Sequence, residues 1–166
     1  MSRSLEGKVA VITGAGRGQG RAHAVRMAEE GADIVGVDIC RQIDSNPYPL
    51  SSPEDLAETA GLVKALGRKM VAIEADVRSR PALAEATATA VRELGKIDIV
   101  VANAGILPMA MGDPDPQDFI DATDVDLVGV MNAVAAAYPY LPDGASIIIT
   151  GSTAGMMPNT TDNPAM

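Results

Sequence analysis

The sequence predicts an α/β fold in which a doubly wound parallel sheet lies between two layers of helices. Short apolar runs alternate with segments of helical pattern, which is typical of strand–helix–strand units that build a parallel sheet. The 166 residues are the length of one domain; 47% are hydrophobic and only 2% aromatic, so the core must be aliphatic. Because no repeat or low-complexity segment divides the chain, we expect residues 1–166 to form a single domain.

The expected elements follow from local signals along the chain. Apolar runs predict strands over residues 9–13, 34–38, 70–74, 97–102 and 146–150. Helical patterns cover residues 21–30, 53–66, 80–95 and 116–138. The clearest helix has Ser52 as its N-cap, Pro53 in its first turn and Gly67 as its stop. Residues 40–52, rich in Pro, Ser and Asn, fit neither pattern and are predicted to be a surface loop inserted after the second strand.

Composition excludes several classes of function. The formal net charge of -9 argues against a nucleic-acid partner, because phosphate binding needs clustered Lys and Arg. A single cysteine and a single histidine leave no disulfide and no cluster that could hold a metal. Neither an apolar signal region nor a membrane-spanning run is visible, so we expect a cytoplasmic protein with no membrane partner.

A glycine-rich loop directly follows the first strand. Residues 13–20 read Thr-Gly-Ala-Gly-Arg-Gly-Gln-Gly, and a helical pattern begins at once. A strand-to-helix turn of this kind aims backbone N–H groups and a helix N-terminus at one point, where a pyrophosphate binds. It predicts a Rossmann-type dinucleotide site. The cofactor-binding residues expected in this loop are Gly14, Arg17, Gly18, Gln19 and Gly20.

The end of the second strand indicates which dinucleotide binds. Asp38, followed by Ile39, lies where an acidic side chain accepts hydrogen bonds from the adenosine ribose hydroxyls, and it would repel a 2′-phosphate. NAD is therefore favoured over NADP, although Arg17 and Arg21 are close in sequence and leave the alternative open.

The spacing Thr-Gly-x-x-x-Gly-x-Gly resembles that of the short-chain dehydrogenase/reductase family, and further motifs occur in the same order. They are Asp76-Val77, Asn103-Ala104-Gly105, the segment from Val125 to Gly129, and the segment from Gly151 to Gly155. The resemblance implies that Asp76 and Val77 contact the adenine. It also implies that the turn from Asn103 through Ala104 to Gly105 lies beneath the cofactor.

The same resemblance suggests two catalytic residues. Ser152 matches the serine that polarises the substrate oxygen in the family, where a tyrosinate moves the proton. Asp126 occupies the position at which the family often has a catalytic Asn, so a carboxylate replaces an amide there. We therefore treat Asp126 as a candidate only.

The family's Tyr-x-x-x-Lys motif is absent from the sequence. None of Tyr48, Tyr138 or Tyr140 has a lysine four positions later. The expectation is a Rossmann domain that is incomplete at its C-terminus, without the last strands and helices, and inactive as these 166 residues alone.

Residues 38–40 and the inserted loop resemble the carveol dehydrogenase, or mycofactocin-coupled, subgroup. The resemblance implies tightly held NAD, an external redox partner, and a small apolar secondary alcohol or ketone as substrate. It also implies a homotetramer or dimer, since the family packs the helix corresponding to 116–138 against another subunit. Two alternatives remain: a non-catalytic NAD-binding module and an S-adenosylmethionine-dependent methyltransferase.

Overall fold

The computed structural model describes residues 3–108 and 115–152 and contains a five-stranded parallel sheet. Its strands are β1 (Val9–Thr13), β2 (Asp33–Asp38), β3 (Met70–Glu74), β4 (Ile99–Ala102) and β5 (Ser146–Ile149). They lie in the order β3-β2-β1-β4-β5. The chain therefore winds outward from β1 to one edge and then from β4 to the other, which confirms the doubly wound fold and places a topological switch point between β1 and β4.

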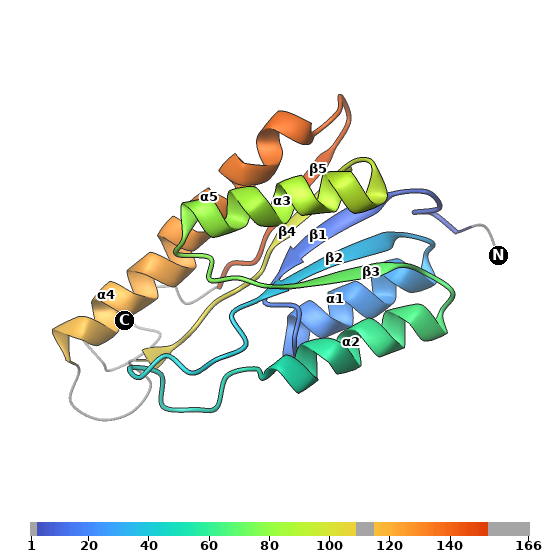
Figure 1. Cartoon of the computed structure of the whole chain (residues 1–166). Helices are drawn as coiled ribbons and strands as arrows, with labels where there is room; N and C mark the ends of the chain where they lie inside the picture. The colour runs from blue at the N-terminus through green and yellow to red at the C-terminus, as the bar shows by residue number, and fades with distance from the viewer. Residues whose placement is uncertain (1–2, 109–114, 153–166) are drawn as a thin grey trace.

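Helices cover both faces of this sheet (Figure 1). On one face lie α1 (Gly18–Glu29) and α2 (Pro53–Ala65), and on the other lie α3 (Arg80–Leu94) and α5 (Val130–Ala137). Alternate residues of β1 serve the two faces: Val9 and Val11 belong to the core beneath α3 and α5, and Ala10 and Ile12 to the core beneath α1 and α2. The predicted three-layer arrangement is therefore confirmed.

The predicted starts and stops of α2 and α3 correspond closely to the observed ones, whereas α1 begins at Gly18, three residues before the predicted start. Ser52 caps α2, because its hydroxyl accepts from the N–H of Asp55 at 3.2 Å while the Asp55 carboxylate accepts from the N–H of Ser52. Gly95 closes α3 in the left-handed conformation, with φ 85°. The fourth strand is shorter than predicted and begins at Ile99. The buried Asp98 before it accepts at 2.9 Å from the N–H of Val9.

The prediction of one continuous α-helix over residues 116–138 is wrong. The structure divides this segment into α4 (Pro116–Thr123), a π-helical turn η2 (Asp124–Gly129), α5, and a 3-10 turn η3 (Tyr138–Tyr140). Within η2, Gly129 lies against the buried Val77, where a Cβ atom would come within 2.6 Å of Val77 Cγ2. Because that approach depends on a residue far away in sequence, the helical periodicity gives no sign of it.

Candidate functional site

A pocket opens at the carboxyl end of the strands, where the strand order reverses. It is lined by every residue that the sequence predicts for cofactor binding. These are Gly14, Arg17, Gly18, Gln19, Gly20, Asp38, Ile39, Asp76, Val77, Asn103, Ala104 and Gly105. Parallel strands present their carboxyl ends at one edge, and the crevice at a switch point is the usual ligand site of such sheets.

The glycine loop is shaped by close backbone approaches. Gly14 has φ 70°, and a Cβ atom there would lie 2.9 Å from the Cα of Ala104. A Cβ on Gly20 would overlap the carbonyl group of Gly14. Arg17 is the N-cap of α1 and makes no side-chain capping hydrogen bond, so the first turn of this 12-residue helix faces the pocket without a side-chain acceptor. Such a terminus favours an anion.

Asp38 is buried at the end of β2, with only 5% of its surface exposed. Its Oδ2 accepts from the N–H of Gly16 at 2.8 Å, and its Oδ1 accepts from the N–H of Cys40 at 3.2 Å and from the hydroxyl of Ser51. Two carboxylate oxygens offer about four acceptor sites. Three donors therefore orient Asp38 while leaving acceptor capacity for one more.

Arg21 ties the glycine loop to α2. Its Nε and Nη2 donate to the carbonyl oxygen of Gly16 at 3.1 and 2.6 Å. Its Nη1 donates to the carboxylate of Glu58 at 2.7 Å, and its Nη2 lies 3.5 Å from that of Asp55. Of the two positive charges that leave NADP open in the sequence, that of Arg21 is thus paired with two carboxylates.

The ends of β1, β4 and β5 are joined beneath the pocket. The hydroxyl of Thr13 accepts from the N–H groups of Asn103 and Ala104 at 3.0 and 3.1 Å. The side chain of Asn103 donates to the carbonyl of Thr13 at 3.1 Å and accepts from the hydroxyl of Thr150 at 3.2 Å. Asn103 therefore also links the ends of three strands, a structural role that its motif alone does not predict.

Asp76 makes several contacts inside the protein. Its carboxylate accepts from the backbone and guanidinium of Arg78 and from Arg41, the latter at 3.2 Å. Burial alone would raise the pKa of Asp76, but the hydrogen bonds from Arg78 and Arg41 outweigh it and lower that pKa. The adenine contact implied by the resemblance stays a prediction, since much of the carboxylate is already engaged.

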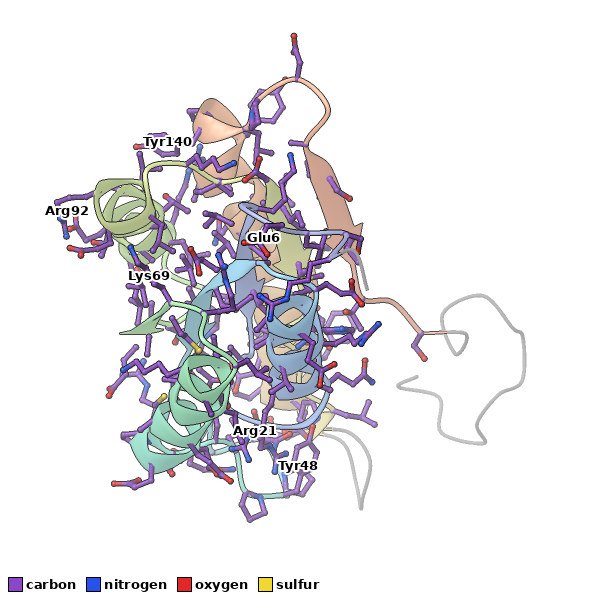
Figure 2. The ribbon with its side chains drawn as sticks, turned by 90° about the vertical axis from the view of Figure 1, so that its right-hand side faces the viewer. Glu6, Arg21, Tyr48, Lys69, Arg92 and Tyr140 are labelled. Carbon is purple, nitrogen blue, oxygen red and sulfur yellow. The ribbon has the colours of Figure 1, made fainter. Side chains whose placement is uncertain are left out.

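The inserted loop forms one wall of the pocket, through Ile43, Tyr48, Leu50 and Ser51. Tyr48 stacks with Arg17, whose Cζ lies 5.7 Å from the ring centroid. The side chain of Gln42 orders the loop from within by donating to the carbonyl of Asn46 at 2.8 Å and accepting from the N–H of Leu50 at 3.0 Å. Figure 2 shows Arg21 and Tyr48 at the same end of the molecule.

Neither of the two candidate catalytic residues is among the residues that line the pocket. Asp126, in η2, accepts from the N–H of Ile106 at 2.9 Å, and Ile106 itself lines the pocket. Although Asp126 is exposed as a residue, partial desolvation of its carboxyl raises the pKa, and the hydrogen bond from Ile106 opposes only part of that shift. Ser152 is exposed, two residues beyond Thr150; the remainder of its motif, residues 153–155, lies outside the described residues.

Several lining residues were not predicted from the sequence. Two of them, Ala75 and Thr150, directly follow strand ends. Ile106 follows the turn from Asn103 to Gly105, and Val125 begins the motif from Val125 to Gly129, so neighbouring signals could have indicated all four. The four residues of the inserted loop carry no such signal. Their place in the wall depends on how the loop folds back over β2.

Over residues 3–108 and 115–152, no helix is long and apolar enough to span a bilayer, and no group of three or more metal-ligating His, Cys, Asp or Glu side chains occurs.

Comparison with known proteins gives consistent matches. A family model described as short chain dehydrogenase matches residues 8–163. A short-chain type dehydrogenase/reductase from Mycolicibacterium smegmatis is 52% identical over 162 residues, which cover 94% of this chain and 58% of that protein. The chain thus spans 58% of that relative's length.

Two solved structures superpose closely. Carveol dehydrogenase from Mycobacterium avium in complex with NAD is 46% identical with a TM-score of 0.89, covering 95% of this chain and 58% of that one. A short chain dehydrogenase from Mycobacterium paratuberculosis bound to NAD is 49% identical with a TM-score of 0.87, covering 92% and 58%.

Proposed function

The chain belongs to the short-chain dehydrogenase family, and from that premise we propose that it forms the NAD-binding part of an oxidoreductase. Bound NAD would supply the hydride acceptor. The substrate would be a small apolar secondary alcohol or ketone, a class supported by the likeness to a carveol dehydrogenase. The observation that carries the proposal is the buried Asp38 facing the same pocket as the glycine loop.

The pocket suits the chemistry of a dinucleotide. The first turn of α1 would hold the pyrophosphate with its backbone N–H groups, since the N-cap residue Arg17 makes no side-chain capping hydrogen bond to them. The remaining acceptor capacity of Asp38 would take a ribose hydroxyl. Ser152 would donate to the substrate oxygen, and Asp126 would hold Ile106 in the wall.

We also propose an assembly of several copies. Apolar side chains are exposed along α4, η2 and α5, including Phe119 at 61%, Leu127 at 66% and Met131 at 55%. Strand β5 ends the described sheet, and its Ile149 is 58% exposed. A dimer or tetramer would cover such surfaces. The proposal extends to a cytoplasmic location, supported by the single cysteine, and to an external redox partner such as a mycofactocin system, supported by the inserted loop.

Isothermal titration of the full-length protein with NAD and NADP tests the cofactor assignment. NAD should bind more tightly than NADP. Asp38→Ala should reduce the difference between the two affinities by lowering the affinity for NAD. Asp44→Ala removes a carboxylate from an exposed position of the inserted loop and should leave the ratio unchanged. Equal affinity of the unmodified protein for both dinucleotides would contradict the assignment. Failure to bind either dinucleotide would likewise contradict the assignment. NAD binding without turnover of any alcohol or ketone would favour the non-catalytic module.

A further inference from the structure

Ser51 lies at the end of the inserted loop and is hydrogen-bonded to Asp38. Asp38 is the residue that, in the proposed function, selects NAD over NADP. The hydroxyl of Ser51 donates to Oδ1 of Asp38, although the two residues are 13 positions apart. Both residues are buried, with 7% of Ser51 and 5% of Asp38 exposed. A hydrogen bond to a carboxylate in such surroundings is stronger than one between neutral groups.

The other two donors to Asp38 are backbone N–H groups, from Gly16 and Cys40. Ser51 is thus the one side chain that donates to Asp38 among the described residues. It is also the donor that comes from outside the strand end and the glycine loop. The orientation of the carboxylate consequently depends on the inserted loop as well as on β2.

Ser51 also packs against the glycine loop. A Cβ atom on Gly16 would lie 2.8 Å from the Cβ of Ser51 and 3.0 Å from Oδ2 of Asp38. The three residues therefore leave no space for an added atom at their junction. Any group attached to a ribose oxygen that is bonded to Asp38 would have to lie beside this junction.

We propose that Ser51 is a specificity-determining residue that favours NAD over NADP by orienting the Asp38 carboxylate and closing the space that a 2′-phosphate needs. This inference rests on the proposed function. A 2′-phosphate site also needs a cation. Arg21 is already held by Glu58 and the carbonyl of Gly16, and Arg17 stacks on Tyr48.

The test is isothermal titration of the full-length protein and its Ser51→Ala variant with NAD and NADP. The Ser51–Asp38 bond is present with and without NAD, so its loss reaches NAD only through the orientation of Asp38. NAD affinity should fall, by less than the about 10-fold to 100-fold that a direct hydrogen bond to a charged group supplies. NADP should weaken less or gain affinity, so the NAD/NADP affinity ratio should fall. Because Ser51 acts through Asp38, the same substitution in an Asp38→Ala background should change the ratio little.

The adjacent serine provides a matched control. Ser52 caps α2 and makes no described bond to Asp38, so Ser52→Ala should lower the melting temperature while keeping the NAD/NADP ratio. If Ser51→Ala fails to fold, Ser51→Cys keeps a side chain of similar size with a weak donor, and it should lower the ratio in the same direction.

The outcomes separate this inference from the proposed function. A lower ratio in Ser51→Ala or Ser51→Cys, absent in the Asp38→Ala background, supports it. If the unmodified protein prefers NAD and a folded Ser51 variant keeps the same ratio, the inference is wrong and the proposed function stands. An unmodified protein that does not prefer NAD overturns both.

Discussion

The hydroxyl of Tyr48 accepts a hydrogen bond from the backbone N–H of Leu107 at 3.0 Å, across 59 residues of sequence. The ring of the same tyrosine lies against the guanidinium of Arg17 in the glycine loop. Tyr48 therefore joins the two rims of the pocket, one formed by the loop after β1 and the other by the segment after β4. The inserted loop is held in place at several points, since Ser45 donates to Asp121 at 2.6 Å.

Removing the Tyr48 hydroxyl should loosen one rim and keep the stack with Arg17. We expect Tyr48→Phe to speed NAD release several-fold, because a net hydrogen bond contributes about 0.5–1.5 kcal/mol. Tyr48→Ala, which also loses the stack, should release NAD faster still. Stopped-flow displacement of NAD measures both rates. Tyr140→Phe, at the opposite end of the molecule in Figure 2, should leave the rate unchanged. A wild-type release rate in Tyr48→Phe would show that the link to Leu107 does not retain the cofactor.

Arg21 holds the glycine loop against α2, an arrangement called the Arg21 clamp below. The clamp should depend on the shape of the guanidinium as well as on its positive charge. Arg21→Lys keeps the positive charge but cannot reach Gly16, Glu58 and the α2 backbone together. It should lower the free energy of unfolding by about 1–3 kcal/mol, measured in urea, and weaken NAD. Arg92→Lys, on the exposed surface of α3, should change neither quantity. If Arg21→Lys matches the unmodified protein in both, the clamp is not needed to shape the loop.

Asp126 predicts a pH-dependent stability. Because its pKa is raised above the usual 3.8, the folded state binds the proton more tightly than the unfolded state does. Stability from this group is full below pH 3.8 and is lost as pH rises through the raised pKa. Asp126→Asn can still accept from Ile106, so it should be more stable near pH 7, and its advantage should shrink as pH falls toward 3.8. Urea unfolding between pH 7 and 4 measures the difference.

Asp121 supplies a control of opposite sign. The hydrogen bond from Ser45, aided by Gln117 and Arg78, lowers the pKa of Asp121 in spite of some desolvation. Its contribution to stability is present above pH 3.8 and is lost as pH falls through the lowered pKa. Asp121→Asn should therefore be less stable than the unmodified protein near pH 7, and the difference in the free energy of unfolding should shrink as the pH falls. Parallel pH curves for the two variants would contradict the account of both groups.

Two glycines in helices should respond in opposite ways to the same substitution. In Gly20→Ala the new methyl group would overlap the Gly14 carbonyl, so α1 must move away from the loop and the protein should be strongly destabilised. Gly61, in α2, has open space around it, and Gly61→Ala should stabilise by about 0.5–1 kcal/mol through helix propensity. Thermal melts of the two variants give the comparison. Equal melting temperatures would mean that Gly20 does not need to be small.

The assignment of Ser152 to the substrate predicts a loss of turnover without loss of cofactor. In the full-length protein Ser152→Ala should reduce kcat by about 100-fold or more, as expected for a donor to a developing oxyanion, and NAD affinity should stay constant. Ser146→Ala, at the opposite end of β5, is the control and should leave kcat unchanged. Undiminished turnover of Ser152→Ala would remove Ser152 from the site.

Much of the fold could be predicted because its signals are local. Each strand is a short aliphatic run, and α2 and α3 begin at serines whose side chains cap them. The glycine loop and Asp38 could be named because parallel strands bring their carboxyl ends to one edge, whatever the details of packing. The remaining cofactor residues were named because their motifs resemble those of the short-chain dehydrogenase family. The glycine loop directly follows β1, and Asp38 is the last residue of β2.

The tertiary structure alone decided the parts of the site that depend on residues distant in sequence. No local pattern places Tyr48 beside Leu107 or Ser51 beside Asp38, and none predicts that the helix after Asp115 passes through a π turn against Val77. The sequence by itself determined the order of the elements and the edge at which the site lies, since periodicity and strand direction are properties of short segments. The wall made by the inserted loop required the structure, because long-range contacts between irregular segments are selected by the packing of the whole chain.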